Sequence, residues 1–201
     1  GPFWGYKKVV ETFELTETPK RLKPINIYYH FYSGSKYESL KALEYVYENV
    51  LKQKTNPQFV SEYVKKVIDF YEYELYNYDN KWVIVSNSNS RTLRVNRKFF
   101  PSIINDSSAG YDTKGDYNYI HLKGSSPYKI IFSEEEPQVP YLKSSNSILE
   151  DYSYKDGEIY IKFKGNVDID YELGNEEKCK ISQKQYKVDT YYVKEIYGRY
   201  R

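Results

Sequence analysis

The clearest structural signal in the sequence is the stretch Glu158–Tyr171, which reads EIYIKFKGNVDIDY. Apolar and polar residues alternate in both of its halves, as they do in strands with one buried face. Successive side chains of a strand point to opposite sides, so the apolar residues of each half share a face. The Gly-containing run KGN between the halves is typical of a hairpin loop. The stretch therefore predicts a hairpin of strands 158–163 and 167–171.

Comparable short runs fill the chain from Glu74 onward, separated by Asn, Asp, Gly and Ser. The other runs expected as strands are Lys81–Ser86, Thr92–Val95, Tyr119–Leu122, Tyr128–Phe132 and Lys187–Val193, and the second half of the hairpin extends to Glu172. Many short strands at this spacing indicate a β-sandwich or a small barrel. Residues 75–201 are therefore expected to form a β-rich domain, sandwich-like or jelly-roll-like.

The pattern is different before residue 75. Pro24–His30 is a compact apolar run, rich in Ile and Tyr, which predicts a buried strand. A second, short strand is expected at Gln58–Val60. Each strand precedes a helix, and this order is typical of α/β segments. One or two strands and two helices have too little core to fold alone. Residues 1–74 must therefore pack on the β domain or form the edge of a larger α/β domain, and the whole chain is expected to be α+β.

Two helices are expected in this first segment. Apolar residues recur at spacings of three and four in both, which predicts one buried stripe on each helix. Ser35 or Ser39 is expected to cap the first helix, and Ser61 the second. Asp69 falls on the side of the second helix that is expected to face solvent. The stripes are Leu40, Leu43, Tyr47, Val50 and Leu51 in the first helix, and Val64, Val67, Ile68 and Tyr71 in the second.

The composition excludes several classes of protein. The chain has 201 residues, of which 40% are hydrophobic and 29% charged, so it is not a disordered polyelectrolyte. No apolar run approaches the roughly 20 residues that cross a bilayer. A formal net charge of +2 gives no field that favours nucleic acid as a partner. The single cysteine, Cys179, allows neither an intrachain disulfide nor a cysteine-based zinc site.

The first residues suggest that the sequence is a piece of a longer protein. It contains no Met and begins Gly1-Pro2, a pair that protease removal of an expression tag commonly leaves. We therefore expect further residues of the parent protein upstream of Tyr6.

His30 is the first candidate for a catalytic role. It stands at the carboxyl end of the expected buried strand and precedes a Gly-containing loop and a helix. In α/β folds, ligands and catalytic groups gather at that edge. A single histidine at such a place is also often structural.

Three runs around His30 resemble the end of the deacetylase domain of PelA-type exopolysaccharide-modification proteins. They are PINIYYHFYSG (24–34), SLKAL (39–43) and NPQFVSEY (56–63), and VETFELT (10–16) adds to the likeness. Proteins of this family are bacterial and periplasmic, and they process a galactosamine-rich biofilm polymer. The resemblance covers residues 7–72 and is much looser beyond them.

The resemblance implies a fold and a role for the first segment. Residues 1–74 would be the C-terminal βα portion of a distorted β/α barrel. His30 would match the histidine beside the metal site that is credited as general acid toward the leaving amine. The parent would then be a metal-dependent hydrolase, with zinc or another divalent metal, and would be periplasmic or extracellular. The chain itself lacks the metal-binding motifs, so we expect no metal site and no cofactor in it, and His121 is expected to be a β-sheet residue.

The 26 tyrosines raise the possibility of sugar binding. Flat aromatic faces stack on sugar C–H groups, and tyrosine hydroxyls bond sugar hydroxyls. Trp82 and Tyr111 are the first candidates, although Trp82 also suits a core position. A compositional bias toward Lys, Asn, Ile and Tyr, together with the strand propensity of tyrosine, explains the same abundance without a ligand.

Three functional hypotheses remain open from the sequence. The first is a C-terminal part of a polysaccharide deacetylase that is inactive alone, with a β domain that supports or binds the galactosamine-rich polysaccharide. The second is a non-catalytic assembly module that binds a protein partner of an export complex, and an exposed apolar patch or an unpaired edge strand would favour it. The third is a small enzyme that uses His30 with a nearby carboxylate.

Overall fold

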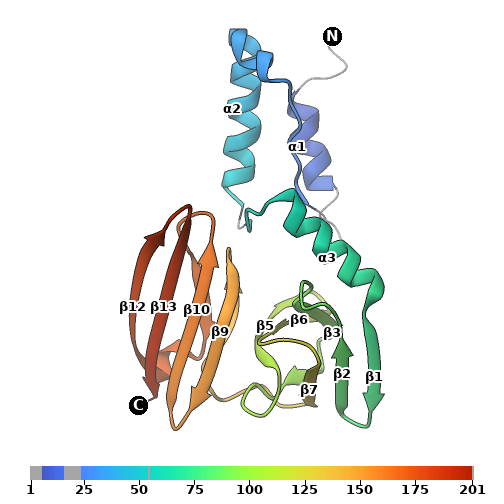
Figure 1. Cartoon of the computed structure of the whole chain (residues 1–201), viewed down its shortest axis with the longest axis vertical. Coiled ribbons are helices and arrows are strands. Elements are labelled where there is room, and N and C mark those ends of the chain that lie inside the picture. The colour runs from blue at the N-terminus through green and yellow to red at the C-terminus, as the bar shows by residue number, and fades with distance from the viewer. Residues whose placement is uncertain (1–5, 16–23, 54, 201) are drawn as a thin grey trace. The chain divides into compact units, whose positions relative to one another are not determined.

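The computed structural model describes residues 6–15, 24–53 and 55–200. These residues form three α-helices and thirteen strands, which lie in four open sheets with antiparallel pairing (Figure 1). The expected mixed, mostly-β class is confirmed. The strands of the described residues close no barrel. No described helix is both long enough and apolar enough to span a membrane.

The helices are α1 (Tyr6–Leu15), α2 (Tyr37–Leu51) and α3 (Val60–Glu72), with the 3-10 helices η2 (Phe31–Ser35) and η3 (Glu176–Lys178). The strands are β1 (Glu74–Tyr78), β2 (Lys81–Val85), β3 (Thr92–Asn96), β4 (Phe100–Pro101), β5 (Ser108–Lys114), β6 (Tyr117–Leu122), β7 (Tyr128–Ser133), β8 (Tyr141–Ser145), β9 (Ile148–Lys155), β10 (Glu158–Gly165), β11 (Tyr171–Gly174), β12 (Cys179–Val188) and β13 (Tyr191–Tyr200). Their orders in the sheets are β1-β2-β7-β4, β3-β6-β5, β11-β8 and β12-β13-β10-β9.

The chain divides into two compact units, residues 1–55 and residues 56–201. In the first unit the described residues form α1, η2 and α2. Pro24–His30 is not the buried strand that its composition predicts, because it has no regular secondary structure and Tyr28 is 81% exposed. A buried strand needs a neighbour for its N–H and C=O groups. The described residues of this unit contain no strand that could serve as one.

Both expected helices exist, but their first turns differ from the prediction. α2 begins at Tyr37 with Lys36 in the N-cap position, and the hydroxyl of Ser35 donates instead to the carbonyl of Tyr32 at 2.7 Å. Phe59 occupies the N-cap of α3, and its N–H donates to the Glu62 carboxylate at 3.0 Å. A Glu side chain in the first turn that accepts a bond from the N-cap N–H can stabilise the start of a helix without a Ser at the N-cap. The expected strand Gln58–Val60 is therefore wrong, since α3 begins at Val60.

α3 is held in the second unit by a carboxylate that the sequence pattern assigned to solvent. The side chain of Asp69 is fully buried and accepts three backbone N–H bonds from the loop before β3. The donors are Asn87 at 2.5 Å, Asn89 at 2.7 Å and Ser90 at 2.7 Å. The Ser90 hydroxyl also donates to the carbonyl of Lys66 at 3.0 Å. Three backbone donors satisfy the buried carboxylate, so Asp69 fixes α3 to the loop between β2 and β3.

The predicted hairpin of residues 158–163 and 167–171 is wrong. β10 pairs with β9 on one side and β13 on the other, and the end of the stretch forms β11, which pairs with β8. Asp156-Gly157 makes the turn between β9 and β10, and both residues have positive φ, 52° and 80°. A two-residue hairpin turn of this type requires positive φ at both positions. The KGN run does not supply that geometry.

The expected strand Lys187–Val193 is also interrupted. Val188 and Tyr191 face each other as the last pair of the β12–β13 hairpin, and Asp189 in the turn has a φ of 51°. The run therefore contains a turn between two strands of ten residues each.

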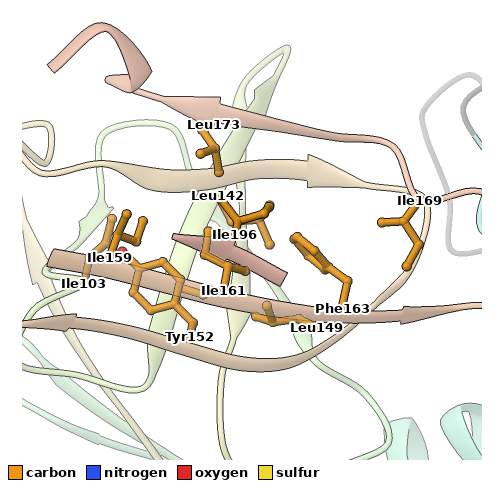
Figure 2. Close-up of a cluster of buried hydrophobic side chains, with 11 residues drawn as sticks. Ile103, Leu142, Leu149, Tyr152, Ile159, Ile161, Phe163, Ile169, Leu173 and Ile196 are labelled. Atoms are coloured by element: carbon orange, nitrogen blue, oxygen red, sulfur yellow. The ribbon is translucent and has the colours of Figure 1, made fainter. Parts of the chain in front are cut away.

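Two hydrophobic clusters support the second unit. The first lies on the inner face of sheet β12-β13-β10-β9, against β8 and β11 (Figure 2). Its fully buried members include Ile161, Phe163 and Ile196. The second lies among β2, β3, β5, β6 and β7 and includes the fully buried Tyr128 and Ile130. Tyr141 packs against both clusters. The first cluster leaves the opposite face of its sheet free to carry a site.

Candidate functional site

His30 lies at the N-cap of η2, and its side chain is exposed. Its ring is stacked on Tyr32, with centroids 4.9 Å apart and planes 7° apart, and meets the edge of Tyr28 at 5.5 Å. No group of three or more His, Cys, Asp or Glu side chains that could hold a metal ion occurs among the described residues. Their donor set does not fit the zinc site that the family resemblance implies.

The two aromatic residues that the sequence nominates for sugar binding belong to the second cluster. Trp82 is half-buried and meets the edge of Phe132, with centroids 5.3 Å apart. Tyr111 is 4% exposed and stacks on Tyr141 at 4.8 Å, with the two hydroxyls 3.3 Å apart. Burial raises the pKa of Tyr111 above its ordinary value. Tyr111 packs in the interior and Trp82 packs partly against it, so neither ring presents a fully open face for stacking on a sugar.

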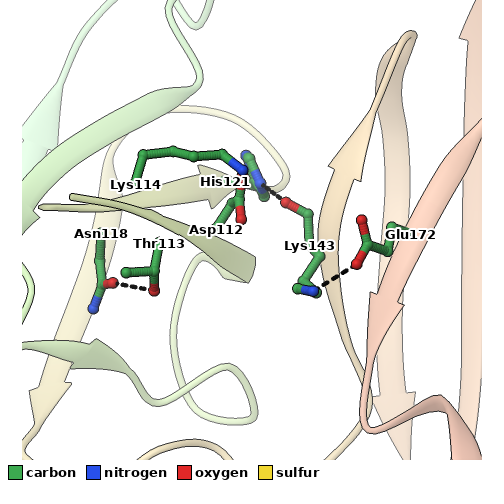
Figure 3. A network of polar contacts seen from close by, with 7 residues as sticks. All are labelled: Asp112, Thr113, Lys114, Asn118, His121, Lys143 and Glu172. Atoms are coloured by element: carbon green, nitrogen blue, oxygen red, sulfur yellow. Dashed lines mark hydrogen bonds and ion pairs between the residues drawn. The ribbon is translucent and has the colours of Figure 1, made fainter. Parts of the chain in front are cut away.

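A polar network surrounds the second histidine (Figure 3). His121 lies in β6, as expected, and its Nε2 is 2.7 Å from the carbonyl oxygen of Lys143 in β8. The Lys143 ammonium pairs with Glu172 of β11 at 2.5 Å, and this hydrogen bond raises the pKa of Lys143. On β5, Lys114 and Asp112 form an ion pair at 3.1 Å. These contacts connect β6 to β8 and β8 to β11, which is a structural role.

The outer face of sheet β12-β13-β10-β9 carries a different set of side chains. The register places Tyr160 of β10 beside Tyr197 of β13, and Ser153 and Ser182 flank them on β9 and β12. These residues alternate with the buried Ile161 and Ile196, so they point away from the first cluster. The centroids of the two tyrosine rings are 5.1 Å apart. An aromatic pair therefore lies near the middle of this face.

Glu195 organises the tyrosines. It accepts hydrogen bonds from the hydroxyls of Tyr160 and Tyr197, both at 3.3 Å, and from that of Tyr186 at 3.5 Å. The Lys184 ammonium lies 2.7 Å from the same carboxylate. Hydrogen bonding from Lys184 lowers the pKa of Glu195 below its ordinary value. Burial, followed by the Glu195 charge, raises the pKa of Tyr160, so its hydroxyl keeps its proton at neutral pH.

Two open depressions share Tyr160 of this aromatic pair. One, of about 500 Å³, is lined by both tyrosines and by cations and hydroxyls of all four strands, among them Lys155, Lys180 and Arg199. The other, of about 710 Å³, is lined by Tyr160 and by Arg91, Ile148, Leu149, Glu150, Asp151, Lys162 and Lys164. Aromatic faces beside hydroxyl, carboxylate and ammonium groups can stack on a sugar and bond its hydroxyls.

The signal for this face was present in the sequence. The alternation that buries Ile159, Ile161 and Phe163 also sends Tyr160 and Lys162 to the other side of β10. The strand prediction for residues 158–163 concerned only the apolar residues, which form the buried face. The pairing of Tyr160 with Tyr197 could not be foreseen, because the partner of β10 is set by the topology.

Neither a protein family model, nor a curated protein, nor a solved structure matches the chain. A function can therefore be inferred only from the geometry of the outer face and from the sequence pattern of residues 7–72.

Proposed function

We propose that this chain is the C-terminal part of a PelA-like polysaccharide deacetylase that is periplasmic or extracellular. Its β-rich unit binds the polysaccharide on the outer face of sheet β12-β13-β10-β9 and does not cleave it. The observation that carries the proposal is the pair Tyr160 and Tyr197, held beside Glu195 above the depression of about 500 Å³. The resemblance of residues 7–72 to the deacetylase family supports an amino-sugar polymer as the ligand.

The shape of the face suits a polymer chain. Its groups lie in rows across four strands, and the two depressions share Tyr160. An extended glycan could follow these rows with successive sugars. Stacking on the tyrosines would supply apolar contact, and the ammonium and hydroxyl groups around them would bond the ring hydroxyls and acetamido groups.

The binding test is a calorimetric titration of the full chain with acetylated and with de-N-acetylated galactosamine oligomers. We expect saturable binding of at least one oligomer, with no requirement for added zinc. Tyr160→Ala and Tyr197→Ala should each weaken binding by roughly tenfold, the loss expected for an aromatic contact of about 1.4 kcal/mol.

Tyr117→Ala is the matched control, because Tyr117 is an exposed tyrosine of a different sheet. It should bind the oligomers like the wild type. Absence of binding, or an equal loss in the Tyr117 variant, would contradict a role for the outer face.

His30 is the residue that the resemblance assigns to catalysis in the longer protein. Imidazole titrates near neutral pH, so it can donate a proton to a leaving amine. Because the donor set of the described residues does not fit the family's metal site, we expect no deacetylation by this chain. Release of acetate from acetylated oligomers, with or without zinc, would contradict this expectation. Loss of that release in His30→Ala would then favour the small-enzyme hypothesis.

A second candidate function is a protein-assembly module, and one specific observation favours it. Apolar residues at four positions along α3 remain exposed: Val60, Val64, Ile68 and Tyr71. A soluble helix normally buries such a stripe. In cells, Ile68→Glu should then reduce association with an export complex and leave the sugar affinity of the purified chain unchanged. An unchanged association would exclude this candidate.

A further inference from the structure

Among the described residues, the first strand of the β-rich unit is paired along one edge alone. β1 pairs with β2 through five successive residues and stands at the end of the sheet β1-β2-β7-β4 (Figure 1). All five of its residues are exposed, and Tyr76 at its centre is 56% exposed. The strand therefore presents apolar and aromatic side chains on both faces and backbone donors and acceptors along its outer edge.

Three of the other sheet ends in the described residues, β12, β9 and β4, carry features that oppose further pairing. β12 has three lysines, Lys180, Lys184 and Lys187. β9 has an irregularity in its register opposite Lys162 and Phe163. β4, at the opposite end of the sheet that begins with β1, has only two residues, one of which is Pro101. Lysines, bulges, prolines and short strands are the usual protections of an edge.

β1 has none of these protections. Its sequence, ELYNY, contains no lysine and no proline, and its register with β2 is continuous. Glu74 is its only charged residue. An added strand would therefore meet regular backbone and little charge, whereas at β12 a second copy of the same edge would bring lysines together.

The sequence of β1 also suits antiparallel pairing with β1 of a second copy of the chain. In an antiparallel pair related by a two-fold axis, the register centred on Tyr76 is the one that pairs all five residues. It places Tyr76 opposite Tyr76 of the other copy, Glu74 opposite Tyr78, and Leu75 opposite Asn77. No like charges face each other, an aromatic pair lies on the axis, and the Glu74 carboxylate can accept a bond from the tyrosine hydroxyl opposite it.

We propose that β1 pairs with β1 of a second copy of this chain, so that two sheets of the order β1-β2-β7-β4 join into one continuous sheet across a two-fold axis. A homodimer with such an interface uses the same surface patch on both subunits. The interface lies on a different sheet from the sugar-binding face, so this inference does not depend on the proposed function.

Sedimentation velocity of the full chain over a range of concentrations tests the proposal. The wild type should show a species of twice the 24.0 kDa chain mass that grows with concentration. Tyr76→Lys and Tyr76→Glu should each be monomeric, because each places like charges opposite one another on the axis. An equimolar mixture of the two variants should restore the dimer, because the charges at the axis are then opposite.

The control is Tyr28→Lys, the same substitution at an exposed tyrosine outside the sheets, which should dimerise like the wild type. Circular dichroism establishes that the Tyr76 variants are folded, and the mixture is a second check, since unfolded variants would not restore a dimer. A monomeric wild type at the highest concentration, dimers in either single variant, or a monomeric mixture would each overturn the proposal.

Discussion

The two units of the chain differ most in what they bury. Among its described residues, the first unit buries two hydrophobic side chains, Val10 and Val46, while Phe31 and Leu51 remain largely exposed. The second unit holds clusters of eleven and eight buried residues. Burial of apolar surface is the main favourable term in folding, so the strands, and not α1 and α2, carry the stability of this chain.

The unit to which the proposed family likeness mainly applies is not the unit that has the large hydrophobic clusters. Most of the runs on which the proposed deacetylase likeness is based lie in the first unit, where few of the described side chains are buried. For the well-packed strands the proposed likeness is loose. The role of His30 is therefore proposed from likeness, whereas the role of the outer sheet face is proposed from geometry. The predictions that follow challenge this division, beginning with the largest expected effect.

The largest effect is expected in the first cluster. Phe163 is fully buried in β10, so Phe163→Ala should lower the free energy of unfolding by about 3–5 kcal/mol. Leu51 in α2 is 72% exposed, and Leu51→Ala should change the same quantity by less than about 0.5 kcal/mol. Urea denaturation followed by circular dichroism measures both. Similar losses of unfolding free energy in the two variants would contradict this difference and show that Leu51 contributes to stability as much as Phe163 does.

The next effect concerns Asp69, which joins α3 to the loop between β2 and β3. Asp69→Ala would leave three backbone donors without their carboxylate, at a cost of roughly 3 kcal/mol in unfolding free energy. Lys65→Ala, at an exposed position of the same helix, is the control and should be close to neutral. Hydrogen exchange of the amides of Asn89 and Ser90 should accelerate only in the Asp69 variant. Unchanged exchange would show that α3 is held by other contacts.

The smallest expected effect is a change of folding stability with pH that arises from Glu195 on the outer face. The pKa of Glu195 is lower in the folded chain than its ordinary value of 4.5, so the ionised carboxylate stabilises the folded state. That contribution is complete above the ordinary value and is lost as the pH falls through the lowered pKa. The difference in melting temperature between wild type and Glu195→Gln should therefore be present near about pH 6 and shrink as the pH falls below the ordinary value of 4.5. A difference that persists in acid would contradict ionisation of Glu195 as its cause.

The sequence predicted elements better than their buried faces or their partners. Spacing identified the helix α2, and alternation identified the inner face of β10. The buried stripes predicted for the helices are wrong, since Leu51 of α2 and Tyr71 of α3 are largely exposed. Alternation carries no information on which strand lies alongside, so the partner of β10 was wrong. The Asp156-Gly157 turn makes β9 that partner, because it can adopt positive φ at both residues.

Two other failures have the same physical origin. Pro24–His30 has the composition of a buried strand, but a strand also needs a neighbour, which composition does not report. Asp69 lies on the polar side of its helix by periodicity, yet loop amides 18 to 21 residues away enclose it. The outer-face pair could not be predicted for the same reason, since Tyr160 and Tyr197 become neighbours only through the β10–β13 register.

The most direct test of the account is an NMR titration of the full, isotope-labelled chain with acetylated galactosamine oligomers. If the outer face of sheet β12-β13-β10-β9 binds the polymer, the shift changes will concentrate on Ser153, Tyr160, Ser182 and Tyr197, and the resonances of α1 and α2 will stay unchanged. Shift changes centred on His30 and its neighbours, with none on these four residues, would contradict the account and assign sugar recognition to the first unit.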